Sequence, residues 1–173
     1  MAATTRLLSI DDAPRLAQLQ ADGREFFAPW DPVRENSHYT TEGQAEVIRR
    51  VRADHGRGVA LPQVILDEAG DVVGRVTLNG IVRGPFQSCS VGYWVAPEAN
   101  GRGYATDALR AITALAFGDL GLHRVQAETL RHNQWSQRVL ARVGFRPIGM
   151  APRYLKIAGE WQDHDLFQLL VEE

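Results

Sequence analysis

The 173-residue chain has one cysteine, no long apolar run and no excess of positive charge. Because Cys89 stands alone, we expect no intrachain disulfide and no Cys-X-X-Cys metal motif, and its place in an expected strand favours a packed thiol over a nucleophile. The net charge of -2 argues against a nucleic-acid-binding protein. The five histidines lack the spacing of metal ligands, so no metal site is expected. Without an apolar signal region or an apolar run of about 18 residues, the sequence predicts a cytoplasmic protein with no membrane segment.

What is present fits one compact domain. Hydrophobic residues make up 45% of the chain, which is enough for a substantial core at this length. We find no internal repeat, linker or low-complexity segment. The sequence therefore predicts a single domain over residues 1–173.

The most informative stretch runs from Val91 to Thr106, where an apolar strand leads through a loop into an amphipathic helix. Gly101 and Gly103 let backbone N–H groups approach a ligand, and the helix start adds free donors and the positive end of its dipole. The loop suits a phosphate or pyrophosphate, and the alternative is a tight strand-to-helix turn without a ligand. A dinucleotide fingerprint is disfavoured, because Thr106 stands where a third glycine is required. The expected buried stripe of the helix is Ala105, Ala108, Leu109, Ile112, Leu115 and Ala116.

Hydrophobic periodicity and turn residues predict the remaining elements. A polar and aromatic segment with two prolines, residues 25–32, is expected to interrupt regular structure. Three strands before the glycine loop should form an antiparallel meander, and the last of them should pair in parallel with the strand after the helix by a right-handed crossover. The expected strands cover 6–10, 59–66, 72–82, 88–95, 124–129, 145–149, 154–158 and 161–171. Four helices are expected. The first follows a start signal at Ser9 and Asp12 and runs from residue 13 toward Gly23, the second covers 42–53, and the third runs from the glycine loop to Gly118. The fourth runs from the cap Asn133 to Gly144, and its inward-facing residues are expected to be Trp135, Val139, Leu140 and Val143.

The loop resembles the acyl-CoA-binding motif of the GNAT superfamily of N-acetyltransferases. That motif reads Gln or Arg, two residues, Gly, one residue, then Gly or Ala, and Asn100 is a departure at its first position. Further motifs along the chain are similar to the RimJ/RimL-type subgroup, which acetylates protein N-termini. They are Asn100-Gly101-Arg102-Gly103-Tyr104-Ala105, the Gly-Tyr-Trp before it, Asn133-Gln134-Trp135-Ser136, Val143-Gly144-Phe145 and Tyr154…Gly159-Glu160-Trp161…Asp163.

The resemblance implies an α+β fold with a central mixed, mostly antiparallel sheet flanked by helices. In that fold two parallel strands splay apart and form the cleft for acetyl-CoA. Residues of the strand end would pair with the pantetheine arm, the glycine loop would hold the pyrophosphate, and the next helix start would add polar contacts. The implied cofactor-binding residues are Trp94, Val95, Ala96, Asn100, Gly101, Arg102, Gly103, Tyr104, Ala105, Thr106, Asn133 and Ser136.

The implied chemistry is direct attack of a primary amine on the thioester in a ternary complex. The resemblance makes Ser136 the candidate proton donor to the sulfur, with Tyr154 as the second candidate. The strand position where many family members carry a basic glutamate reads Gln87-Ser88-Cys89-Ser90 here, so the general base is open. The candidates are Glu25, Glu128, Asp163 and His164, of which Glu25 and Glu128 are favoured.

Aromatic residues are expected to line the acceptor pocket, and the alternative is that they seal a loop against the core. A peptide N-terminus or an amine with an apolar body fits such a pocket better than a polycation. Two other functions stay open: acetylation of an antibiotic, amino acid or polyamine, and a non-catalytic acyl-CoA-binding regulatory module. A homodimer is a further possibility from the family. The candidate acceptor residues are Phe26, Phe27, Trp30, Asn79 and Trp161.

Overall fold

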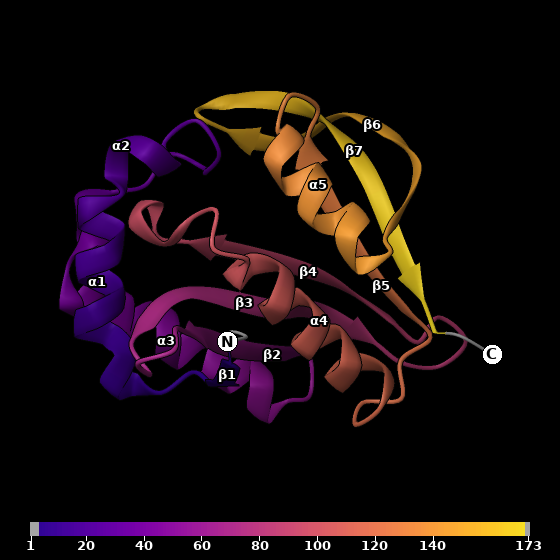
Figure 1. Ribbon diagram of the computed structural model, residues 1–173, viewed down its shortest axis with the longest axis horizontal. Coiled ribbons are helices and arrows are strands. Elements are labelled where there is room, and N and C mark those ends of the chain that lie inside the picture. The colour runs from indigo at the N-terminus through magenta and orange to yellow at the C-terminus, as the bar shows by residue number, and fades with distance from the viewer. Residues whose placement is uncertain (1–3, 172–173) are drawn as a thin grey trace.

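The computed structural model describes residues 4–171. Within them, seven strands form one sheet in the order β1-β2-β3-β4-β5-β7-β6 (Figure 1). All neighbouring strands are antiparallel except β4 and β5, which are parallel, so the mixed sheet and its antiparallel meander are confirmed. The strands are β1 (Thr4–Leu7), β2 (Ala60–Leu66), β3 (Val72–Val82), β4 (Ser88–Val95), β5 (Arg124–Leu130), β6 (Arg146–Ile157) and β7 (Glu160–Leu170). The helices are η1 (Ile10–Asp12), α1 (Ala13–Asp22), α2 (Arg24–Phe27), η2 (Asn36–Tyr39), α3 (Thr41–Gly56), η3 (Pro97–Ala99), α4 (Tyr104–Phe117) and α5 (Gln134–Val143).

Helices cover both faces of the sheet, and each side has its own core (Figure 1). One core joins α4 and α5 to β3, β4 and β5, and the other joins α1 and α3 to β2 and to Leu8, the residue that follows β1. The alternation of side chains along a strand sends neighbouring residues of β4 to opposite faces, because Tyr93 packs on the α4 side and Trp94 on the α1 side. None of the helices within residues 4–171 is long and apolar enough to cross a membrane.

The helix boundaries follow from local signals in the sequence. Ser9 and Asp12 form a reciprocal capping box at η1, immediately before α1. Asn133 caps α5 through a hydrogen bond that its side chain accepts from the Ser136 N–H, and Gly144 ends this helix with a φ of 103°. The predicted helix starts and stops at these positions are confirmed.

Several expected boundaries are wrong at the two ends of the chain. The first strand ends at Leu7, because the Ser9 cap turns the chain into η1, and part of the expected irregular segment 25–32 is helical as α2. The expected strands 145–149 and 154–158 are one strand, β6, which pairs with β7 on both sides of a register shift between Ala151 and Leu155. The Asp163 carboxylate accepts a hydrogen bond from the Arg153 N–H inside this bulge.

The expected buried faces of α4 and α5 also differ from the structure in part. On α4, Leu109 and Ile112 are buried as predicted, whereas Ala105 and Leu115 are only partly buried. On α5, Trp135 is 70% exposed instead of facing the core. Tyr104, Thr106 and Thr113 join the buried stripe of α4.

The parallel pairing of β4 and β5 is short. It joins Ser88, Cys89 and Ser90 to residues 124–126 and then stops. Figure 1 shows the two strands diverging from there in a V, with α5 and the β6–β7 hairpin on one arm. Cys89 lies at the closed end, where burial raises the pKa of its thiol to about 12. This supports the packed thiol over a nucleophile.

Candidate active site

A cleft of about 540 Å³ opens where β4 and β5 diverge. Its walls come from the end of β4, the glycine loop, the first turn of α4, α2 with the segment after it, and the exposed side of α5. Trp135 belongs to this wall, which explains why it is not in the core. The sequence-predicted residues that line the cleft are Phe26, Phe27, Trp30, Trp94, Val95, Asn100, Gly101, Gly103, Tyr104, Ala105, Thr106, Asn133 and Ser136.

The glycine loop has the shape that a pyrophosphate requires. Gly101 and Gly103 have φ values of 78° and 90°, which side chains rarely adopt, and a Cβ on either residue would point into open space. Gly103 is also the N-cap of α4 and has no side chain with which to satisfy the first N–H groups of the helix. These donors and the helix dipole fit the phosphates of acetyl-CoA.

Arg102 and Ala96 have other partners than the predicted ones. The Arg102 guanidinium lies 5.1 Å from the centre of the Tyr104 ring and 3.5 Å from the Glu68 carboxylate. The Tyr104 hydroxyl donates to the same carboxylate, and this hydrogen bond is the main reason why the pKa of Glu68 is lowered. The Ala96 N–H donates to the Val73 carbonyl, and the Ala96 carbonyl accepts from the Ala99 N–H, so both backbone groups already have partners within the protein. Neither residue lines the cleft.

Two hydroxyl groups meet on the α5 side of the cleft. The Ser136 Oγ lies 2.8 Å from the Tyr93 hydroxyl, at the first turn of α5. The Asn133 Oδ1 already accepts a hydrogen bond from the Ser136 backbone N–H, at an N···O distance of 3.1 Å, so the Ser136 hydroxyl is not needed to cap the helix. Burial raises the pKa of Tyr93 to about 12, so this phenol keeps its proton at neutral pH. Tyr93 was not among the residues that the sequence predicted for the site. The signal that could have found Tyr93 is the alternation with Trp94 in the Gly-Tyr-Trp motif, which places Tyr93 on the α5 side.

A carboxylate lies on the opposite face of the same opening. Glu128 comes two residues after Gln126, where the β4–β5 pairing stops, and Ala127 beside it packs into the α4 core. Glu128 therefore points to the other face of the sheet. Burial raises the pKa of its carboxyl above the ordinary value. Across the opening, β4 presents Gly92 on that face, which is exposed and leaves room for an approaching ligand.

Aromatic residues close this second face at the open end of the V. The Phe27 and Trp94 rings meet edge to face at 5.4 Å, and the Trp30 ring lies 5.4 Å from the His132 ring. A backbone hydrogen bond joins the segment after α2 to the turn between β6 and β7. The segment is therefore attached to both arms of the V.

Glu128 is not among the residues that line the cleft, and the remaining candidate residues also lie outside its wall. Glu25 and Asn79 are exposed, and the Tyr154 and Trp161 side chains are 44% and 62% exposed on the β6–β7 hairpin. Asp163 accepts a backbone hydrogen bond within that hairpin, and His164 is buried with its Nδ1 2.9 Å from the Gln162 carbonyl.

The splayed parallel strands and the glycine loop at a helix start define an enzyme that binds an acyl-CoA. The chain matches the family model of the acetyltransferase (GNAT) domain over residues 4–146, and it belongs to this family. The GNAT fold, the acyltransferase activity and the use of acetyl-CoA that the sequence predicts are confirmed.

Several N-acetyltransferases are similar to this chain over nearly its whole length. The probable N-acetyltransferase YjcK of Bacillus subtilis is 34% identical over 95% of this chain and 92% of its own. The [ribosomal protein uS5]-alanine N-acetyltransferase of Escherichia coli is 34% identical over 95% of this chain and 85% of its own. The structure of Mycobacterium smegmatis RimJ in complex with CoA-disulfide has a TM-score of 0.94 at 31% identity, and covers 98% of this chain and 82% of that one. The protein therefore transfers acetyl groups from acetyl-CoA to an amine acceptor.

Substitution of the loop glycines tests the phosphate cradle. We expect G101A and G103A each to raise the KM for acetyl-CoA about tenfold, because a Cβ displaces the phosphates from the backbone donors. G121A is the matched control, since Gly121 also has a positive φ and open space but lies outside the cleft. Initial rates of thiol release over a range of acetyl-CoA concentrations measure the effect. Equal KM values for G101A, G103A and G121A would contradict the assignment.

Proposed function

We propose that the enzyme acetylates the N-terminal α-amine of a protein, and that the two faces of the splayed sheet divide the two proton transfers of the reaction. The observation that carries the proposal is the placement of Glu128 on one face of the opening and of Ser136 with Tyr93 on the other. When bound, acetyl-CoA supplies an acetyl group on a thioester that an amine can attack directly.

Glu128 accepts the proton of the attacking nitrogen. Its raised pKa makes the carboxylate a stronger base than an exposed glutamate, and its face of the sheet is the one that Gly92 leaves open. The aromatic residues Phe27, Trp30 and Trp94 hold the apolar part of the acceptor beside it.

Ser136 donates a proton to the departing sulfur. The Tyr93 hydroxyl lies 2.8 Å from the Ser136 Oγ and 3.3 Å from the Ser136 carbonyl. When the phenol donates to the Oγ, the hydrogen of the serine hydroxyl is free to point into the cleft. The high pKa of Tyr93 keeps the phenol protonated throughout the physiological range. Tyr93 is therefore a positioning residue that acts through Ser136.

A protein acceptor is supported by the relatives. The Escherichia coli enzyme is named for the alanine of ribosomal protein uS5, and we extend this class of acceptor to the present chain. An open cleft mouth edged by exposed aromatic rings also suits an extended peptide. A small-molecule amine is the competing acceptor within the same chemistry.

A panel of acceptors tests the proposed function. We expect thiol release from acetyl-CoA with short peptides that begin with Ala or Ser, and much slower release with polyamines and aminoglycosides. The same peptides with a blocked α-amine are the control and should give only the background rate. Turnover of a polyamine or aminoglycoside with no turnover of any peptide would contradict an N-terminal acetyltransferase.

The proton donor is tested by three variants at saturating substrates. We expect S136A to lower kcat about 10²-fold and Y93F about tenfold, with unchanged KM for acetyl-CoA, because a donor of this kind contributes about 10²–10⁴ to the rate. The double variant should be no slower than S136A, since Tyr93 acts through Ser136. The comparison is Y154F, which we expect to remain within about twofold of the wild type because the Tyr154 hydroxyl lies outside the cleft. A larger loss in Y154F than in S136A would reverse the assignment.

The two favoured bases are separated by their pH profiles. We expect E128Q to lower kcat about 10²-fold, and E25Q, an exposed residue of α2, to change it less than about twofold. Because a base must be ionised, kcat of the wild type should fall as the pH decreases through the raised pKa of Glu128. Rates measured from pH 5 to pH 9 should show that limb in E25Q and lack it in E128Q. The opposite pattern would make Glu25 the base.

A further inference from the structure

A second cavity, which we call the side cavity, lies behind the aromatic wall of the cleft. It has a volume of about 300 Å³ and is bounded by α1, α2, the segment from Ala28 to Tyr39 and the β6–β7 turn. Phe27 lines both this cavity and the acetyl-CoA cleft, so the two spaces adjoin at one side chain. The side cavity therefore lies beside the place where the acceptor must enter.

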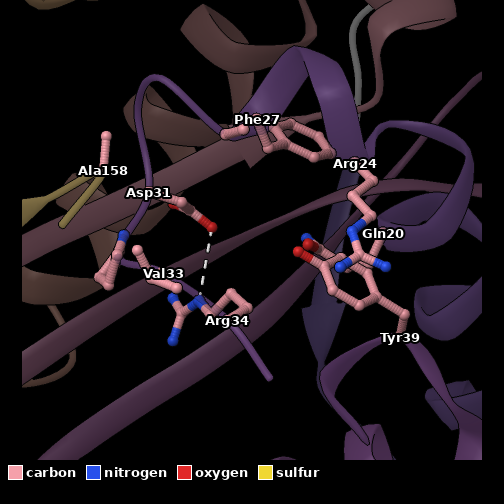
Figure 2. A pocket seen from close by; sticks show the side chains of 10 residues that line it. Gln20, Arg24, Phe27, Asp31, Val33, Arg34, Tyr39 and Ala158 are labelled. Atoms are coloured by element: carbon pink, nitrogen blue, oxygen red, sulfur yellow. Dashed lines mark ion pairs between the residues drawn. The ribbon is translucent and has the colours of Figure 1, made fainter. Parts of the chain in front are cut away.

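Charged and polar groups surround the side cavity. Figure 2 shows the Asp31–Arg34 ion pair on one side, and Arg24 with Gln20 and Tyr39 facing it from the other. The Arg34 Nε lies 3.7 Å from the Asp31 Oδ2, which is longer than a hydrogen bond. Asp31 is the only acidic residue in the wall, against two arginines. The lining thus carries a net positive charge.

A third guanidinium, that of Arg75, is close enough to Arg34 for the two charges to interact, although Arg75 does not line the side cavity. Arg75 of β3 is partly buried, and its Nε donates to the Thr77 Oγ1 at 3.2 Å. Among residues 4–171 no hydrogen bond is found for its two terminal nitrogens. Burial and the nearby charge of Arg34 lower the pKa of Arg75 to about 10, so it stays charged at neutral pH.

The remaining titratable neighbour does not change this balance. His38 of η2 lies 3.3 Å from the Gln20 Oε1, and burial together with the charges of Arg34 and Arg75 lowers its pKa to about 4. It is therefore neutral. The wall of the side cavity thus holds one carboxylate against two arginines, and the charge of Arg75 lies close to that of Arg34, so the positive charges are incompletely neutralised.

We propose that the side cavity binds a carboxylate of the acceptor, held by Arg34, and that the enzyme therefore prefers acidic acceptors. This inference rests on the proposed function, because it assumes that the acceptor amine lies beside Glu128. Arginine matches a carboxylate with two parallel hydrogen bonds, and within residues 4–171 no hydrogen bond is found for the two terminal nitrogens of Arg34. The same charges repel a polyamine. The carboxylate comes from an acidic side chain near the N-terminus of a peptide or from the α-carboxylate of a short acceptor.

Calorimetry on the CoA-loaded protein tests the preference without turnover. The probes are amidated pentapeptides that begin with Ala and carry one Glu at position 2, 3 or 4, each compared with its Gln counterpart. A neutral pentapeptide with a free α-carboxylate, compared with its amide, tests the second source. We expect at least one carboxylate to improve binding about tenfold over its neutral counterpart, as a charge-assisted hydrogen bond provides.

Two arginine variants make the result specific. We expect R34Q to bring that ratio close to one. R57Q should retain it, because Arg57 pairs with Asp54 on the surface of α3 and lies outside both cavities. Equal or undetectable binding in every pair, or a ratio that survives R34Q, overturns the inference. Thiol release with the same peptides separates the two proposals. If the peptides are acetylated but bind equally well with and without the carboxylate, only the proposal for the side cavity is wrong. If a carboxylate improves binding but no peptide is acetylated, only the proposed N-terminal acetylation is wrong.

Discussion

The active site depends on the point at which β4 and β5 stop pairing. Beyond Ser90 and Gln126 the two strands no longer share hydrogen bonds, and an opening forms through the middle of the sheet. Unpaired strand edges are normally a liability, and here the facing edges of β4 and β5 are left open beyond that point. The glycine loop, the start of α4 and the cap of α5 all lie at the rim of this opening. The cleft is thus a consequence of topology before any side chain is considered.

The same opening sorts side chains by face. Because alternate residues of a strand point in opposite directions, Tyr93 and Trp94 are neighbours in sequence but serve different sides of the sheet. In the proposed mechanism, Tyr93 joins Ser136 on the face where the thiol leaves, whereas Trp94 and Glu128 lie on the face where the amine arrives. The arginines of the side cavity extend that second side away from the cofactor. The acetyl-CoA cleft and the side cavity adjoin at Phe27, which lines both.

Local signals in the sequence predicted much of this structure. The glycines, caps and periodic helices were placed well because their causes lie within a few residues. Two features depend on distant contacts and were not predicted. Trp135 lies over the open cleft, where no strand covers it, and the β6 bulge keeps one strand continuous through a proline-containing stretch. The Tyr93–Ser136 contact joins residues 43 positions apart, so no local pattern indicates it.

The most direct test of the two-face account is a crystal structure with a bisubstrate conjugate, in which the sulfur of CoA is joined through an acetyl bridge to the α-nitrogen of an Ala-initiated peptide. The account predicts that the bridge crosses the opening between β4 and β5. The sulfur would then lie beside the Ser136 hydroxyl, and the peptide would leave on the face of Glu128 and Trp94. A conjugate with its nitrogen and sulfur on the same face of the sheet, and its nitrogen remote from Glu128, would contradict it.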